Sequence, residues 1–232
     1  MTLLLSLETS THSFSGALHQ EGKLVSYKES SENQTTASML SVRIDELFKN
    51  SGFKKNQLSA VIIASGPGSY TGLRIGVATA KGICYALNIP LISVNTLSLM
   101  TWQFINQLSS EYDLEGVLLC PMLDARRMEV YCMLMDKAGQ IIEPIQAKVI
   151  DEQSFSDLLD RKKIYFFGEG SDKCKNSIHH PNAKFVSGSK PSASALGVIG
   201  FQKFERNEFE NTDLFEPLYL KDFVIKKPNL IS

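Results

Sequence analysis

The sequence predicts a mixed α/β protein made of two related lobes, of which the second is shorter than the first. Three strands open the chain, helices and strands then alternate as far as residue 108, and a second run of three strands begins near residue 116. This order is typical of a mixed sheet covered by helices. No sequence repeat connects the two halves, so the duplication follows from the order of elements alone. A polar stretch at residues 107–115 marks the boundary, which predicts lobes of residues 1–108 and 109–232.

The first lobe is predicted to run βββαβαβα. Its second and third strands are joined by a turn at residues 20–23. The hydrophobic residues then change to helical spacing, with Leu40, Ile44 and Leu47 on one face. The β-branched run at residues 60–64 predicts a fully buried strand. The predicted strands cover residues 2–8, 13–19, 24–29, 60–64 and 90–94, and the predicted helices cover residues 35–50, 73–87 and 96–108.

The second lobe repeats the three-strand start and adds only short helices before its last one. That last helix, near residues 192–204, has small and apolar residues on two adjacent faces, and we expect it to pack back on the first lobe. An extended segment at residues 215–221 and a basic stretch with Lys226 and Lys227 follow it. The other predicted elements are strands at residues 116–123, 129–135, 141–149 and 164–167 and a helix at residues 152–159.

The charge balance argues against a protein that holds nucleic acid by itself. Lys and Arg number 24 against 25 Asp and Glu, for a net charge of −1, whereas binding to a nucleic-acid backbone needs clustered positive charge. No apolar stretch approaches the ~20 residues of a membrane span, and the apolar start of the chain is too short for a signal peptide. The four cysteines show no CxxC pattern and are expected to be buried free thiols. These features favour a cytoplasmic protein.

Two loops near the ends of predicted strands could face a phosphate group. The Gly-rich turn at residues 66–72 opens a helix, where backbone N–H groups can bind an anion, but it matches neither a Walker A loop nor GxGxxG. The alternative is a tight connection that needs glycine for its backbone. The hydroxyl-rich turn at residues 8–11 is either a second phosphate-facing loop or a polar turn that caps itself. The candidate phosphate-facing residues are Thr9, Ser10, Thr11, Gly66, Gly68, Ser69, Thr71 and Gly72.

The sequence offers no catalytic residue and no metal ligand. It has no Gly-x-Ser-x-Gly elbow, and its histidines include no HxxxH or HExxH pair. His179 and His180 are adjacent, so in an extended segment they would point in opposite directions. The turn at residues 124–129 could pair charges across a site or a partner surface, or it could be a solvated turn.

The helices at residues 35–50 and 72–88 have more apolar and small positions than one packed face needs. The second helix has a row of Gly72, Gly76 and Ala80 and another row of small residues at positions 78, 82 and 86. One row can pack on the sheet and the other is left for a neighbour; the alternative is burial on both sides within one chain. The predicted partner interface consists of Met39, Val42, Arg43, Glu46, Leu73, Arg74, Gly76, Val77, Ala80 and Lys81.

Several segments closely resemble the bacterial TsaB (YeaZ) family. The most specific is Gly66–Gly76 with Ala80-Lys81-Gly82, and Leu5–Thr11 and Asp124–Tyr131 support it. Further matches at residues 166–174 and 216–223 extend the resemblance over nearly the whole chain. The resemblance implies a two-lobed actin-like ATPase (ASKHA, ribonuclease H-like) fold with a reduced second lobe.

The resemblance also implies that the chain catalyses no reaction itself. Family members are non-catalytic scaffold or dimerisation subunits that bind and activate TsaD, which with TsaE makes N6-threonylcarbamoyladenosine at position 37 of tRNAs that read codons starting with A. We therefore expect TsaD and TsaE as partners, a homodimer when the chain is alone, tRNA contact only through the complex, no membrane, and no cofactor apart from ATP or ADP at the complex interface. The matched interface helices are those at residues 35–50 and 72–88.

Two other functions stay open on the sequence. One is a nucleotide-dependent kinase or ATPase of the same fold, which would need Glu8 to hold a metal and residues 66–72 to bind phosphate. Glu8 stands where the family usually has Asp, and this places the phosphate loop in question. The weaker alternative is a glycoprotease-like peptidase, which no metal or triad spacing supports.

Overall fold

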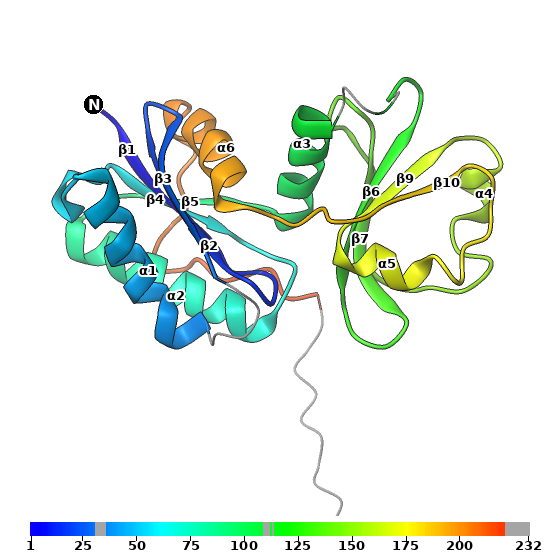
Figure 1. The fold of residues 1–232 in the computed structure, drawn as a ribbon, viewed down its shortest axis with the longest axis horizontal. Helices are drawn as coiled ribbons and strands as arrows, with labels where there is room; N and C mark the ends of the chain where they lie inside the picture. Colours follow the sequence, from blue (N-terminus) through cyan, green and yellow to red (C-terminus); the bar gives the residue numbers. More distant parts are fainter. Residues whose placement is uncertain (31–35, 109–111, 113, 221–232) are drawn as a thin grey trace, which may run out of the picture.

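The computed structural model describes residues 1–30, 36–108, 112 and 114–220 and places two five-stranded sheets side by side (Figure 1). The strand orders are β3-β2-β1-β4-β5 and β10-β9-β6-β7-β8. In each sheet the central strand, β1 (Leu3–Glu8) or β6 (Leu118–Asp124), is antiparallel to the next strand along the chain and parallel to a later one. The two sheets therefore share one topology, which confirms the two-lobed α/β fold predicted from the order of elements.

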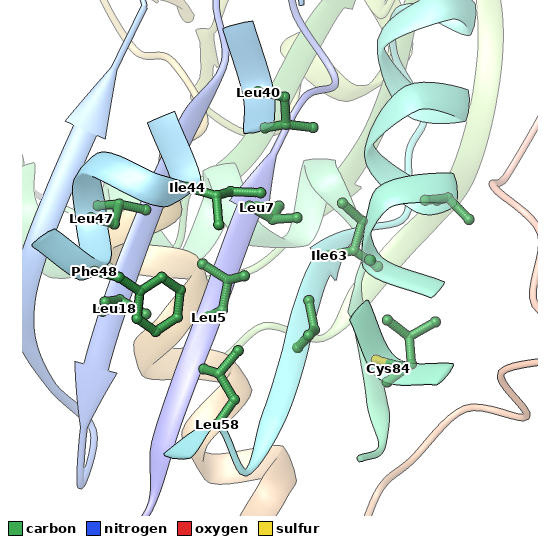
Figure 2. Close-up of a cluster of buried hydrophobic side chains, with 14 of the residues drawn as sticks. Leu5, Leu7, Leu18, Leu40, Ile44, Leu47, Phe48, Leu58, Ile63 and Cys84 are labelled. Atoms are coloured by element: carbon green, nitrogen blue, oxygen red, sulfur yellow. The ribbon is translucent and has the colours of Figure 1, made fainter. Parts of the chain in front are cut away.

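The first sheet is covered on both faces. Along β1, Leu3, Leu5 and Leu7 face helices α1 and α2, whereas Leu4 faces α6. Figure 2 shows the core on the α1–α2 side. Because both faces of β1 are buried, the strand is an almost continuous apolar run. The elements of this lobe are β1, β2 (Ser15–Gln20), β3 (Lys23–Glu29), β4 (Ala60–Ala64), β5 (Leu91–Val94), α1 (Thr36–Ser51), α2 (Tyr70–Leu87), α6 (Ala193–Glu205) and the 3₁₀ turn η1 (Lys55–Gln57).

The second sheet has shorter helices on one face. Helix α5 and strand β10 escaped the sequence analysis because each is a single short segment without a clear period. The basic stretch with Lys226 and Lys227 lies outside the described residues. The remaining elements of this lobe are β6, β7 (Glu129–Met135), β8 (Ile141–Val149), β9 (Ile164–Phe167), β10 (Ala183–Val186), α4 (Ser156–Leu159) and α5 (Glu169–Cys174).

Two helices each pack on the sheet of the other lobe and not on the sheet whose strands precede them in the sequence. Helix α3 (Thr96–Leu108) directly follows the last strand of the first sheet, but it packs on the second sheet, where the Phe104 and Phe167 rings stack with centroids 4.4 Å apart. Helix α6 follows the second sheet and packs on the first, as expected. Each covers a sheet face that the lobe's own helices leave open.

Helix α6 fits the first sheet only because glycine occupies two of its positions. His19 of β2 is buried, and its Nε2 lies 2.9 Å from the Ser194 carbonyl oxygen of α6. A Cβ atom at Gly197 would lie 2.0 Å from Nδ1 of the same ring, and one at Gly200 would lie 2.2 Å from Ile62 Cδ1. The helix backbone therefore lies directly on the sheet.

The four cysteines are free and buried, as the sequence predicted. Over residues 1–30, 36–108, 112 and 114–220, none of the helices combines the length and the hydropathy that crossing a membrane requires.

Replacing Gly197 by Ala should lower the free energy of unfolding by about 2 kcal/mol, because the new methyl group overlaps the His19 ring in a packed interior. The matched control is Gly82→Ala in α2. No atom lies within 4 Å of its Cβ position, so this change should raise stability by about 1 kcal/mol. Chemical denaturation of the isolated chain measures both. Equal stability of Gly197→Ala and the wild type would contradict the described packing of α6.

Candidate functional site

A cleft of about 440 Å³ lies between the two lobes and brings together three turns that are far apart in the sequence. The loop after β1 contributes Ser10 and Thr11, the loop between β4 and α2 contributes Gly68, Ser69 and Thr71, and the β6–β7 hairpin contributes Asp124 through Arg127. Five of the eight candidate phosphate-facing residues line this cleft. The other three, Thr9, Gly66 and Gly72, are buried in the first lobe and do not line it.

The two candidate phosphate loops are packed against each other. The Ser69 N–H donates to the Ser10 carbonyl oxygen at 2.6 Å. A Cβ atom at Gly72 would lie 2.1 Å from the Thr9 carbonyl oxygen, and one at Gly68 would lie 2.2 Å from that of Ser10. Glycine is thus required at these positions by the close approach of the neighbouring loop, which is the packing alternative considered from the sequence.

Glu8 is the last residue of β1, and its side chain bonds to the loop that follows the strand. The carboxylate accepts hydrogen bonds from the backbone N–H of Ser10, at 2.7 Å, and from the Ser10 hydroxyl. Burial raises the pKa of Glu8 to about 7, opposed by the hydrogen bonds from Ser10 and reinforced by the negative charge of Glu169. Glu8 does not line the cleft. Its arrangement fits a structural carboxyl group that closes the loop.

Lys173 of helix α5 holds the β6–β7 hairpin in place. Its Nζ donates to the carbonyl oxygens of Arg127, at 2.6 Å, and Glu129, at 2.7 Å, and forms an ion pair with Asp124. The charge of Asp124 is therefore paired within the second lobe and not across the cleft. Because α5 is so short, its sequence did not show that Lys173 faces the hairpin.

Arg126 and Arg127 are exposed at the cleft edge, in left-handed backbone conformations with φ of 71° and 48°. Acidic Glu129 and Glu169 line the same cleft. The cleft can thus offer hydroxyl groups and charges of both signs to a polar ligand. Among the described residues, His, Cys, Asp and Glu form no group of three or more that could hold a metal ion. Of the adjacent histidines, His180 accepts a hydrogen bond from the Asn182 N–H at 3.1 Å and stabilises its own loop.

The structure corrects part of the predicted partner interface. Leu73, Gly76, Val77 and Ala80 are buried in the chain's own core, so their side chains are not exposed to a partner. These four residues lie on the buried side of α2; a Cβ atom at Gly76, for example, would lie 2.2 Å from Thr9 Oγ1. Substitution with charge at Val77 would disrupt the fold itself.

The second row of small residues on α2 is the one that faces outward. Ala78, Gly82 and Ala86 are exposed, and no atom lies within 4 Å of the Gly82 Cβ position. On α1, Val42 is 44% exposed and Met39 is half-buried. We refer to the exposed Val42, Ala78, Gly82 and Ala86 as the α1–α2 face. The helical pattern showed two rows, but it did not show which row the sheet would take.

The charged members of the predicted interface have contacts within the chain. Arg43 and Glu46 form an ion pair at 2.8 Å. The Arg74 Nη1 donates to the Tyr70 hydroxyl at 2.7 Å. The Lys81 Nζ donates to the carbonyl oxygens of Asp213 and Phe215, both at 3.1 Å. Lys81 therefore fastens the C-terminal segment to α2.

This two-lobed architecture with an interlobe cleft defines an actin-like ATPase fold. A solved structure described as an uncharacterized protein with similarity to peptidase YEAZ, from Pseudomonas aeruginosa, superposes with a TM-score of 0.78 at 23% identity, covering 95% of this chain and 100% of that one. A more distant likeness of fold links the chain to a sugar-kinase-like structure, the Lmo2764 protein from Listeria monocytogenes, with a TM-score of 0.50 at 7% identity over 88% of this chain and 100% of that one.

Sequence comparison identifies the family. The family model described as TsaD: tRNA N6-adenosine threonylcarbamoyltransferase matches residues 33–227. The tRNA threonylcarbamoyladenosine biosynthesis protein TsaB of Bacillus subtilis is 27% identical over 221 residues, covering 86% of this chain and 87% of that protein. The Haemophilus influenzae protein of the same name is 36% identical over 129 residues, covering 55% of this chain and about half, 51%, of its own length. The chain belongs to the TsaB (YeaZ) family, as its motifs indicated.

Replacing Glu8 by Gln should stabilise the protein above pH 7 and change it little near pH 4.5. The folded-state pKa of Glu8, about 7, lies above its ordinary value of 4.5, so the native state binds more protons than the unfolded state between these pH values. Stability contributed by Glu8 is therefore lost as the pH rises through this window. The shift corresponds to about 3 kcal/mol.

Urea unfolding of wild type and Glu8→Gln at pH 4.5 and pH 8 measures this difference. Burial lowers the pKa of His19, so the stability that His19 controls is lost as the pH falls, but this effect is common to both proteins and cancels. A stability difference that does not change with pH would show that Glu8 is not buried as described.

Proposed function

We propose that the chain takes part in the biosynthesis of threonylcarbamoyladenosine in tRNA, as a non-catalytic subunit that binds and activates a TsaD-family partner through its α1–α2 face. Membership of the TsaB family supports the pathway. The match to the TsaD family model supports a partner that is related to this chain. The observation that carries the binding role is the exposed small-residue row of α2.

Gly82 is the key residue of this row. Glycine inside a helix costs about 1 kcal/mol relative to alanine. The buried glycines of α2 are required by Thr9, which lies against them, but Gly82 has open space above it. Because nothing in the described chain compensates this cost, a partner helix that approaches the backbone closely at Ala78, Gly82 and Ala86 is the proposed reason for it.

The packing of the two candidate phosphate-facing loops supports a scaffold over the kinase or ATPase alternative. That alternative needs Glu8 as a metal ligand, but its carboxylate is buried and hydrogen-bonded to Ser10. The glycines of residues 66–72 are needed for packing against Thr9 and Ser10. We propose that ATP or ADP, where it is needed, binds at the interface of the complex.

The proposal extends to the rest of the assembly. TsaE joins the complex, the chain forms a homodimer when TsaD is absent, and tRNA is contacted only through the complex. The net charge of −1 agrees with tRNA binding by a partner. Since tRNA modification takes place in the cytoplasm, that is where we propose the chain works.

Gly82→Glu should weaken binding to the TsaD-family chain of the same organism by at least roughly 100-fold, or about 2.7 kcal/mol, because it places an unpaired charge between two closely packed helices. The isolated chain should be at least as stable as the wild type, since position 82 contacts nothing else and glutamate is a better helix former than glycine. Isothermal titration calorimetry measures the affinity, and thermal unfolding checks the fold.

The matched control is Gln202→Glu, which adds the same charge at an exposed position of α6, on the opposite face of the first sheet. It should bind the partner like the wild type. If Gly82→Glu binds as tightly as Gln202→Glu, the α1–α2 face is not the partner surface.

A further inference from the structure

The segment after α6, residues 206–220, lies across the first lobe without helix or strand and is called the strap below. It passes the edge of the sheet, where the Glu210 N–H donates to the Leu91 carbonyl oxygen at 2.9 Å. Lys81 then holds it to α2 through two backbone carbonyl groups. Figure 1 shows this segment in orange to red, leading from α6 toward the space between the lobes.

The end of the strap rests on the Gly-rich loop. The Leu218 N–H donates to the Ser65 carbonyl oxygen at 2.8 Å. A Cβ atom at Gly66, whose φ is +100°, would lie 2.9 Å from the Leu218 carbonyl oxygen. The lack of a side chain at Gly66 therefore leaves room for the strap backbone, a role that the sequence did not indicate. The next residue, Tyr219, is fixed in position at the start of α2.

Tyr219 joins Tyr70 and Arg74 in an ordered cluster on the surface. The Tyr219 and Tyr70 rings lie with centroids 5.0 Å apart. The Arg74 guanidinium carbon lies 5.2 Å from the centroid of the Tyr70 ring, and Arg74 Nη1 donates to the Tyr70 hydroxyl group. Tyr70 remains 36% exposed and Tyr219 39% exposed. The three side chains thus present aromatic and cationic surface in a geometry that they hold among themselves.

We propose that this cluster of Tyr70, Arg74 and Tyr219 is an anchor for the TsaD-family partner, continuous with the α1–α2 face, and that the strap exists in part to deliver Tyr219 to it. The inference rests on the proposed function. Tyr and Arg side chains provide a large share of interface binding energy. Side chains that are already ordered lose little entropy on binding.

The position of the cluster on α2 makes it reachable by the same partner. Arg74 lies four residues before Ala78 on the exposed side of the helix, roughly 6 Å along its axis at 1.5 Å per residue. The row of Ala78, Gly82 and Ala86 allows close approach but offers few atoms for contact. A partner helix that docks on this row needs larger anchoring groups near by, and the cluster provides them one turn away.

The test compares Tyr219→Ala with Phe209→Ala in calorimetric titrations against the TsaD-family chain. Phe209 is 41% exposed on the same strap, but its ring packs 5.7 Å from that of Phe204 in α6, away from the cluster. Tyr219→Ala should raise the dissociation constant at least tenfold. The melting temperature of the isolated chain should be unchanged, because the hydrogen bonds from Lys81 Nζ and to the Ser65 carbonyl oxygen still hold the strap. Phe209→Ala should leave the dissociation constant unchanged.

Gly82→Glu, measured in the same series, separates the inference from the proposed function. If Gly82→Glu weakens binding and Tyr219→Ala does not, the anchor is overturned and the proposed function stands. If neither weakens binding, both are overturned. An equal loss in Tyr219→Ala and Phe209→Ala with a lowered melting temperature assigns the effect to strap folding and overturns the anchor. Loss of self-association alone in Tyr219→Ala overturns the choice of partner in favour of a second copy.

Discussion

The close approach of the β1–β2 loop to helix α2 is the constraint on which the rest of the first lobe depends. The Thr9 carbonyl oxygen and hydroxyl group lie where Cβ atoms of Gly72 and Gly76 would be, and the Ser69 N–H bonds to the Ser10 carbonyl oxygen. Any side chain at these two helix positions would push α2 away from the sheet. Backbone contact thus sets the orientation of the helix about its axis.

That orientation determines which residues of α2 remain exposed. With Gly72 and Gly76 turned inward, Leu73 and Val77 follow into the core, and the row through Ala78 and Gly82 turns outward. Lys81 is carried to the edge, where it binds the strap, and Tyr70 meets Tyr219 at the beginning of the helix. The exposure of the α1–α2 face and the attachment of the strap to α2 therefore follow from the orientation of this helix.

The same contact explains the form of the interlobe cleft. The two candidate phosphate-facing loops are hydrogen-bonded to each other, and Glu8 is hydrogen-bonded inside its own turn. On the opposite wall, Lys173 holds the hairpin that carries Arg126 and Arg127. Burial of this carboxyl group raises its pKa to about 7.

The sequence by itself determined the family, most of the strands and helices of both lobes, and the presence of two small-residue rows on one helix, because periodicity and motif residues are local properties. It did not determine which row of α2 is buried, that α3 covers the second sheet, or that Gly66, Lys81 and Lys173 fasten segments distant in the chain. Those outcomes depend on which surfaces meet when the sheets and helices pack. A residue such as Lys81 looks like any exposed helix charge until the strap lies beside it, so only the tertiary structure decided its role.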